Sequence, residues 1–116
     1  MRHITVTVQG EAFQATLADT EAARALAERL PLTLEMSELN GNEKYAYLDA
    51  SLPTEPTRPG TIHAGDIMLF GDDCLVLFYE TFSSSYRYTR IGSLDDASGL
   101  ARAVGAGSVS VAWERA

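Results

Sequence analysis

The chain has 116 residues, 46% of them hydrophobic and 22% charged, a size and composition that favour one domain with a single core. The formal net charge of −7 and the pI near 4.6 oppose binding to phosphate backbones, so we expect neither nucleic acid nor an anionic membrane as a partner. The sequence contains no apolar run of the roughly 18 residues that a membrane span needs, and its first residues lack the apolar stretch of a signal peptide. These features predict a cytoplasmic location.

A hairpin is predicted at the start of the chain. Apolar and polar residues alternate over 4–9 and again over 13–17, with the period of two that is typical of half-buried strands. Gly10 and Glu11 lie between the two runs, and a glycine at the first turn position suits a type II′ turn. We therefore expect two antiparallel strands joined by a turn that begins at Gly10.

A helix is expected next. Asp19 or Thr20 can cap its amino end, because a short side chain with an oxygen acceptor satisfies a free N–H group of the first turn. Pro31 ends the helix, since proline disfavours helical geometry at the residue before it. The apolar stripe between these limits has the spacing i, i+3, i+4 and i+7 and consists of Ala23, Leu26, Ala27 and Leu30.

Short strands and one long loop are predicted in the middle of the chain. Alternation resumes over 32–37, an Asn-Gly pair marks the next turn, and Tyr45 and Tyr47 share one face of a short strand. The segment 51–60 holds three of the four prolines and has no periodicity. A surface loop is the structure that such a segment favours.

Two strongly apolar strands are expected after this loop. They cover 67–70 and 74–80 and are joined by a Gly-Asp-Asp turn, and apolar side chains point to both faces of the pair. Such strands are covered on both sides, so we expect the barrel interior on one face and a helix or a neighbouring sheet on the other. The single cysteine, Cys74, belongs to this pair and is expected to be a buried apolar residue rather than a reactive thiol.

The last third of the chain predicts a β-prone stretch over 86–92, a short helix around Leu100 and a final strand over 109–113. The candidate caps of this helix are Asp95, Asp96 and Ser98. Seven or eight short strands in a flat sheet would leave two exposed edges. We therefore expect a mostly β fold, in which about eight strands close into a barrel and two helices cover its ends.

Several stretches of the chain resemble one protein family. They are Leu17-Ala18-Asp19-Thr20, Ala22-Ala23, Leu30-Pro31, Asn40-Gly41-Asn42-Glu43, Gly65-Asp66-Ile67-Met68-Leu69-Phe70-Gly71-Asp72, Leu77-Phe78-Tyr79 and Ser85-Tyr86-Arg87-Tyr88-Thr89-Arg90-Ile91-Gly92. The pattern runs along nearly the whole chain and is similar to that of the bacterial cyclophilin-like family of small stand-alone domains. This resemblance implies a cyclophilin-type β-barrel closed by two helices, in agreement with the predicted element order.

The resemblance implies a fold and no particular activity. Cyclophilins proper are peptidyl-prolyl isomerases whose site combines a strand arginine with a Phe-Met-x-Gln-x-Gly segment. That segment is absent here, because Gln9 and Gln14 are the only glutamines and neither follows a Phe-Met pair. No isomerase residue can therefore be transferred by motif, and an isomerase with a divergent active site stays an alternative.

The candidate ligand-binding residues are mostly aromatic or cationic, and all but Tyr47 lie within residues 79–90. They are Tyr47, Tyr79, Glu80, Phe82, Tyr86, Arg87, Tyr88 and Arg90. Aromatic rings stack on a peptide or a planar molecule and arginine holds a carboxylate, while Glu80 is expected to pair with Arg87 or Arg90. The plainer interpretation of these residues is an ordinary solvated rim at the barrel opening. Tyr45 is expected to extend the surface beside Tyr47, with the proline-bearing loop as one wall.

Other kinds of site have little support. His3 and His63 lie far apart with no cysteine or carboxylate in a ligand pattern, so we expect no metal site, and no motif indicates a cofactor. The sequence therefore predicts a non-catalytic binding domain for a peptide or a small molecule. A structural module that forms a homodimer is a further alternative, and the oligomeric state is left open.

Overall fold

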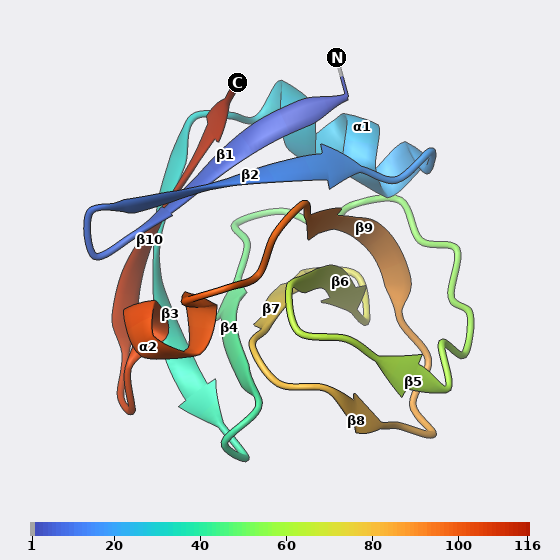
Figure 1. Ribbon diagram of the computed structural model, residues 1–116. Helices are drawn as coiled ribbons and strands as arrows, with labels where there is room; N and C mark the ends of the chain where they lie inside the picture. Colours follow the sequence, from blue (N-terminus) through green and yellow to red (C-terminus); the bar gives the residue numbers. More distant parts are fainter. Residues whose placement is uncertain (1) are drawn as a thin grey trace.

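The computed structural model describes residues 2–116, and this part of the chain forms ten strands and two helices (Figure 1). Eight of the described strands close into an antiparallel barrel in the order β1-β10-β3-β4-β7-β6-β9-β2, with β2 paired to β1, and β5 pairs with β8 in a separate small sheet. The predicted mostly β barrel is confirmed. The strands are β1 (His3–Val8), β2 (Glu11–Leu17), β3 (Leu32–Leu39), β4 (Glu43–Tyr47), β5 (Thr61–Ile62), β6 (Asp66–Phe70), β7 (Cys74–Phe78), β8 (Phe82–Ser83), β9 (Thr89–Leu94) and β10 (Val109–Arg115), and the helices are α1 (Glu21–Glu28) and α2 (Leu100–Val104).

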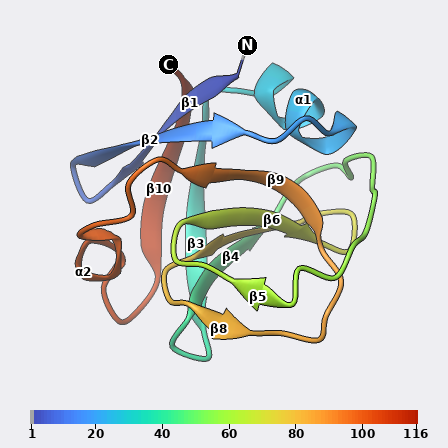
Figure 2. The same cartoon turned by 45° about the vertical axis from the view of Figure 1, so that its right-hand side comes forward.

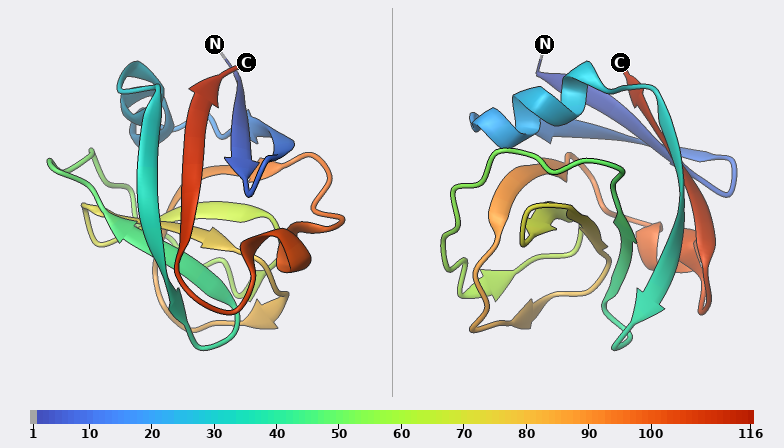
Figure 3. Two further views of the ribbon diagram at one scale, coloured as in Figure 1. Left: turned by 90° about the vertical axis from the view of Figure 1, so that its left-hand side faces the viewer. Right: turned by 180° about the vertical axis from the view of Figure 1, so that it is seen from behind.

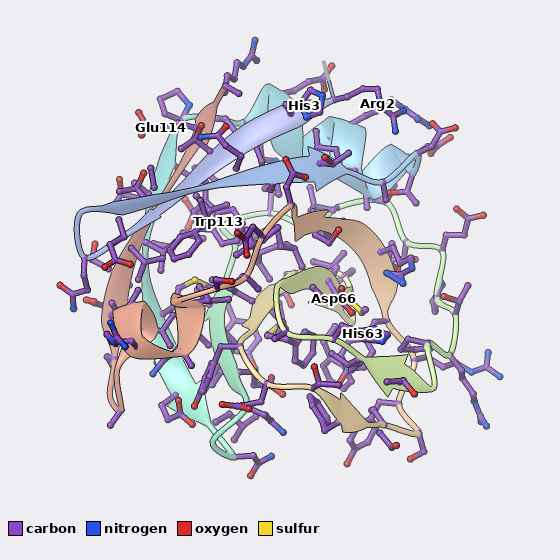
Figure 4. The ribbon with its side chains drawn as sticks, viewed as in Figure 1. Arg2, His3, His63, Asp66, Trp113 and Glu114 are labelled. Atoms are coloured by element: carbon purple, nitrogen blue, oxygen red, sulfur yellow. The ribbon has the colours of Figure 1, made fainter. Side chains whose placement is uncertain are left out.

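The barrel interior is filled by the apolar residues that alternate along its strands. Ile4, Val6 and Val8 of β1 have no exposed surface, and Val6 pairs with Trp113 of β10, which is also completely buried. Figure 4 shows Trp113 inside the ring of strands. Because successive side chains point to opposite faces of a strand, the alternation seen in the sequence becomes an inward apolar face and an outward polar one.

The two helices lie at opposite ends of the barrel (Figures 1 and 3). Helix α1 lies at the end where the two termini meet, and its amino end is capped by Thr20, whose hydroxyl accepts a hydrogen bond from the N–H of Ala23 at 3.1 Å. The same hydroxyl donates to the carbonyl of Arg90 at 2.8 Å, which ties the helix to β9. Thr20 is therefore the cap, rather than Asp19. Neither helix of residues 2–116 is long and apolar enough to cross a membrane.

Three local predictions are wrong in detail. Gln9 and Gly10 both have positive φ (52° and 79°), so the first hairpin has a type I′ turn that begins at Gln9. Helix α2 begins after Gly99, whose left-handed conformation starts the helix without a side-chain cap. Strand β9 begins at Thr89 rather than at residue 86, because Tyr88 forms an isolated bridge with Thr57 of the long loop.

A second, smaller core covers the outer face of β6 and β7. Its buried members are Ile62, Met68, Cys74, Val76, Phe78 and Tyr88, and Tyr45 and Phe82 pack against it. The small β5–β8 sheet lies against these strands in Figures 1 and 2. The neighbouring sheet that the two-sided apolar pattern predicted is therefore β5–β8 together with the segment that carries Tyr88.

Candidate functional site

A groove lined by aromatic residues lies on the outer wall of the barrel, next to this second core. It encloses about 330 Å³. The residues that line it, called the aromatic groove from here on, are Leu39, Asn40, Glu43, Tyr45, Tyr47, Phe70, Cys74, Val76, Tyr86 and Tyr88. The sequence predicted that such a surface would lie at the barrel opening. The structure places it on the side of the barrel instead, because β4, β6 and β7 turn apolar residues outward as well as inward.

The strand register explains which side chains meet in the groove. Tyr47 of β4 and Phe70 of β6 both pair with Cys74 of β7, so they flank this buried cysteine from its two sides. Glu43 and Tyr45 follow Tyr47 along the same face of β4, because side chains two positions apart point the same way. The groove therefore has a floor of β7 side chains, one wall from β4 and an opposite wall that begins with Phe70.

Each wall of the aromatic groove is built from rings at steep angles to one another. The Tyr45 and Tyr47 ring centroids are 6.0 Å apart with the planes at 81°. On the other side, the rings of Phe70 and Tyr86 have the same separation and angle. Tyr88 packs against Phe70 at 5.7 Å and anchors this wall to the second core. Such edge-to-face contacts stabilise the walls beyond the area that they bury.

Two buried or half-buried titratable groups give the groove its electrostatics. Burial, and after it the charge of Glu38, raises the pKa of the Glu43 carboxyl to about 7. Burial, and after it the charges of Glu43 and Asp73, raises the pKa of the Cys74 thiol to about 11. Cys74 is therefore a neutral thiol at physiological pH and lacks the thiolate character of a nucleophile. Glu43 is close to half ionised at neutral pH.

The predicted aromatic residues separate into three places. Tyr47, Tyr86 and Tyr88 line the aromatic groove. Phe82 lies beside it and packs on Phe78 with ring centroids 5.6 Å apart. Tyr79 points away from the groove toward the barrel end near α2, where its hydroxyl donates to Glu38 Oε1 at 2.8 Å.

Tyr79 belongs to a buried polar cluster centred on Lys44. The ammonium of Lys44 has no exposed surface, lies 2.9 Å from Glu38 Oε1 and is 5.4 Å from the centroid of the Tyr79 ring. It also donates to the carbonyls of Gly105 and Gly107, at 2.9 and 2.5 Å. Burial raises the pKa of Glu38, but the hydrogen bonds from Lys44, Tyr79 and the backbone of Gly41, together with the charge of Lys44, outweigh it and hold that pKa below its ordinary value. The charges of Lys44 and Glu38 therefore pair with each other, and the cluster joins the β3–β4 hairpin to the segment that follows α2.

The predicted charged residues lie outside the aromatic groove. Arg87 lines a neighbouring cavity of about 480 Å³, together with Thr54 and Pro56 of the long loop, and this cavity shares Tyr88 with the groove. Arg90 is exposed on β9. Glu80 is exposed too, and within residues 2–116 it forms no ion pair with either arginine, so that expected pairing is wrong.

A match to a family model assigns the chain to a family. The model of the cyclophilin-like family matches residues 6–114. The chain belongs to the cyclophilin-like family. It is also similar in structure to a hypothetical protein from Archaeoglobus fulgidus known from its solution structure, with 20% sequence identity and a TM-score of 0.63 over 99% of this chain and 95% of that one. This likeness shows the fold alone. No curated protein matches the chain.

Several lining residues of this cyclophilin-like domain were not among the predicted site residues. They are Leu39, Asn40, Glu43, Phe70, Cys74 and Val76. One signal could have found Glu43, since it precedes Tyr45 and Tyr47 by two and four positions and must share their face of the strand. Phe70 joins the site only through the pairing of β6 with β7, which no pattern within a single strand predicts.

The histidines of the domain lie away from the groove. His3 is at the start of β1, and His63 lies on another part of the molecule beside Asp66 (Figure 4). The His63 Nδ1 is 4.0 Å from Asp66 Oδ2, and the same carboxylate accepts a hydrogen bond from the backbone N–H of His63 at 2.9 Å. This contact holds the turn before β6. Among the residues that the structure describes, no cluster of three His, Cys, Asp or Glu could hold a metal ion.

Proposed function

We propose that this cyclophilin-like domain is a non-catalytic binding module that takes a small organic molecule, or an apolar side chain of a peptide, into the aromatic groove. The observation that carries the proposal is the distribution of exposed apolar side chains. Among residues 2–116, the large hydrophobic side chains with high exposure are Tyr47 (67%), Tyr86 (63%), Phe70 (46%) and Leu39 (43%), and all of them line this groove. Exposed apolar side chains that gather in one place indicate an interaction site.

Two further features support a ligand of small size. The enclosed volume of about 330 Å³ lies in the range of sites for small molecules. The floor is formed by buried side chains of β7, and Tyr88 is held by contacts with Phe70 and Phe78, so much of the groove is built before a ligand arrives. A preformed site loses less conformational entropy on binding.

Substitution of the rim tyrosines tests the proposal. We expect Tyr86→Ser and Tyr47→Ser to weaken the binding of indole, a neutral aromatic probe, by at least about tenfold, because each removes a ring that would contact the probe. Both side chains are largely exposed and each loses one edge-to-face contact, so the free energy of unfolding should fall by only about 0.5–1 kcal/mol. Titration of the labelled protein by NMR measures the affinity, and thermal unfolding measures the stability.

Arg90→Ala is the matched control, since Arg90 is exposed but lies outside the groove. It should leave the affinity for indole unchanged. Equal affinities in the wild type and both tyrosine variants would contradict the proposal, as would a failure of the wild type to bind indole at millimolar concentration.

The alternatives make different predictions. No arginine lines the groove within the described chain, so the structure offers no observation in favour of a prolyl isomerase with a displaced arginine. A homodimer through the groove would appear as a doubled mass in sedimentation at micromolar concentration, and Tyr86→Ser would return it to the monomer. The cytoplasmic location and the exclusion of nucleic acid stay predictions.

A further inference from the structure

The aromatic groove carries one group with a formal charge, and that charge is negative. Among residues 2–116, Glu43 is the acidic residue that lines it, and no Lys, Arg or His does. Lys44, the neighbour of Glu43 in sequence, points inward and is bound to Glu38. The chain as a whole, Glu43 included, carries a formal net charge of −7. An anionic ligand would therefore meet unfavourable electrostatics in this groove, and a cationic ligand would meet favourable ones.

The arrangement of rings also suits a cation. Tyr47 and Phe70 lie on either side of β7, which places their backbones two strand spacings apart, or about 10 Å. A cation is attracted to an aromatic face within about 6 Å of the ring centre, so a cation between these walls can contact both. Within each wall the planes of the two rings lie at 81° to each other, so the two rings of a wall face different directions. Quaternary ammonium groups are recognised by several aromatic side chains that surround them.

Glu43 lacks a partner for its charge. Within the described residues, its half-buried carboxyl has no ion pair and no side-chain hydrogen bond. Its charge nevertheless affects the pKa values of two other residues that line the groove. Burial is the main cause that raises the pKa of both Cys74 and Tyr88, and the charge of Glu43 adds to it in each. A bound cation would supply the countercharge that the protein does not provide.

We propose that the aromatic groove binds the ammonium head of an organic cation, with the aromatic walls around its methyl or methylene groups and the carboxylate of Glu43 as its countercharge. This inference rests on the proposed binding function of the same groove and names the class of ligand.

A comparison of three probes of the same shape tests the charge preference. Choline carries a trimethylammonium group, 3,3-dimethylbutanol is its neutral analogue, and 3,3-dimethylbutanoate is an anion of similar size. We expect choline to bind at least about tenfold more tightly than the neutral analogue, and the anion to bind most weakly. NMR titration of the labelled full-length chain measures all three affinities.

The pH dependence identifies Glu43 as the countercharge. If the ionised form alone attracts the cation, a pKa of about 7 means that choline binds about tenfold more tightly at pH 8 than at pH 6. Glu38, with a lowered pKa, and Cys74 and Tyr88, with raised ones, keep one charge state over this range. In Glu43→Gln the affinity for choline should be lower and should not change between these pH values.

The outcomes separate the two proposals. Equal affinity for choline and its neutral analogue, or an unchanged pH dependence in Glu43→Gln, would overturn the cation inference and leave the binding function in place if indole still binds. Failure of indole and of all three probes would overturn both. A stability check by thermal unfolding ensures that Glu43→Gln is folded, and Tyr47→Ser provides a second variant that should weaken choline binding without altering its pH dependence.

Discussion

Substitution of Lys44 by alanine is expected to destabilise the protein by about 2–4 kcal/mol, because it empties the site of a fully buried side chain and removes the donor that its hydrogen-bond acceptors share. The ammonium contacts Glu38 and the carbonyls of Gly105 and Gly107, and the variant would remove one donor from each of these acceptors. The pKa of Glu38 should rise, since the variant removes both the hydrogen bond and the positive charge by which Lys44 lowers it. Urea unfolding at pH 7 measures the loss of stability.

The double variant Lys44→Met with Glu38→Gln is the control. The methionine fills most of the volume of the Lys44 side chain, and the pair of substitutions removes both charges. The double variant should therefore be more stable than Lys44→Ala by at least about 1–2 kcal/mol. The stabilisation from Glu38 in the wild type is present at neutral pH and is lost as the pH falls through the lowered pKa of this group. A Lys44→Ala variant within about 1 kcal/mol of the wild type would show that the buried cluster does not hold the barrel end together.

Gly92→Ala is expected to cost about 2–4 kcal/mol, because a side chain at this position meets backbone that cannot move aside. Gly92 lies where β9 pairs with β2, one of the strand pairs that make up the closed barrel. A Cβ atom there would be 2.5 Å from the carbonyl oxygen of Thr16 and 3.1 Å from the Cα of Leu17. The two strands would have to separate to relieve these contacts.

Gly107→Ala is the matched control for this effect. A Cβ atom at Gly107 would have no neighbour within 4 Å, and its backbone is not left-handed, so the change should be neutral or slightly stabilising. Thermal unfolding of both variants measures the difference. If the two variants had equal stability, the backbones of β2 and β9 could not lie as close together at Gly92 as they do in the structure.

Much of the fold could be predicted from single segments of the sequence. The alternation over 4–8, 13–17 and 109–113 predicted strands that the structure contains. Because β6 and β7 have apolar residues on both faces, the sequence predicted that other parts of the protein pack on each face. The barrel interior packs on one face and the small β5–β8 sheet on the other. These predictions succeeded because the burial of a strand's face leaves a period of two in its own residues.

The site was harder to predict because it depends on contacts between strands. Tyr86 and Tyr88 follow one another with the spacing of one face, but Phe70 and Glu43 reach the groove through the register of β4, β7 and β6. The arginines were assigned to the same surface because they lie close to the tyrosines in the sequence, and this closeness does not place side chains on one face. Regular pairing of β9 begins only at Thr89, and its register with β6 shifts between Ile67 and Met68. Arg87 therefore lies beside the groove rather than in it.

The measurement that tests the account most directly is a map of the backbone amides that shift when indole is added to the labelled protein. The groove predicts one continuous set of perturbed amides, in 43–47, 70–76 and 86–88, the segments that form its walls and floor. The chemical shifts of the amides around α1 and around α2, at the two ends of the barrel, should not change. Perturbations centred on those ends, or scattered over the surface, would contradict a binding site on the outer wall of the barrel.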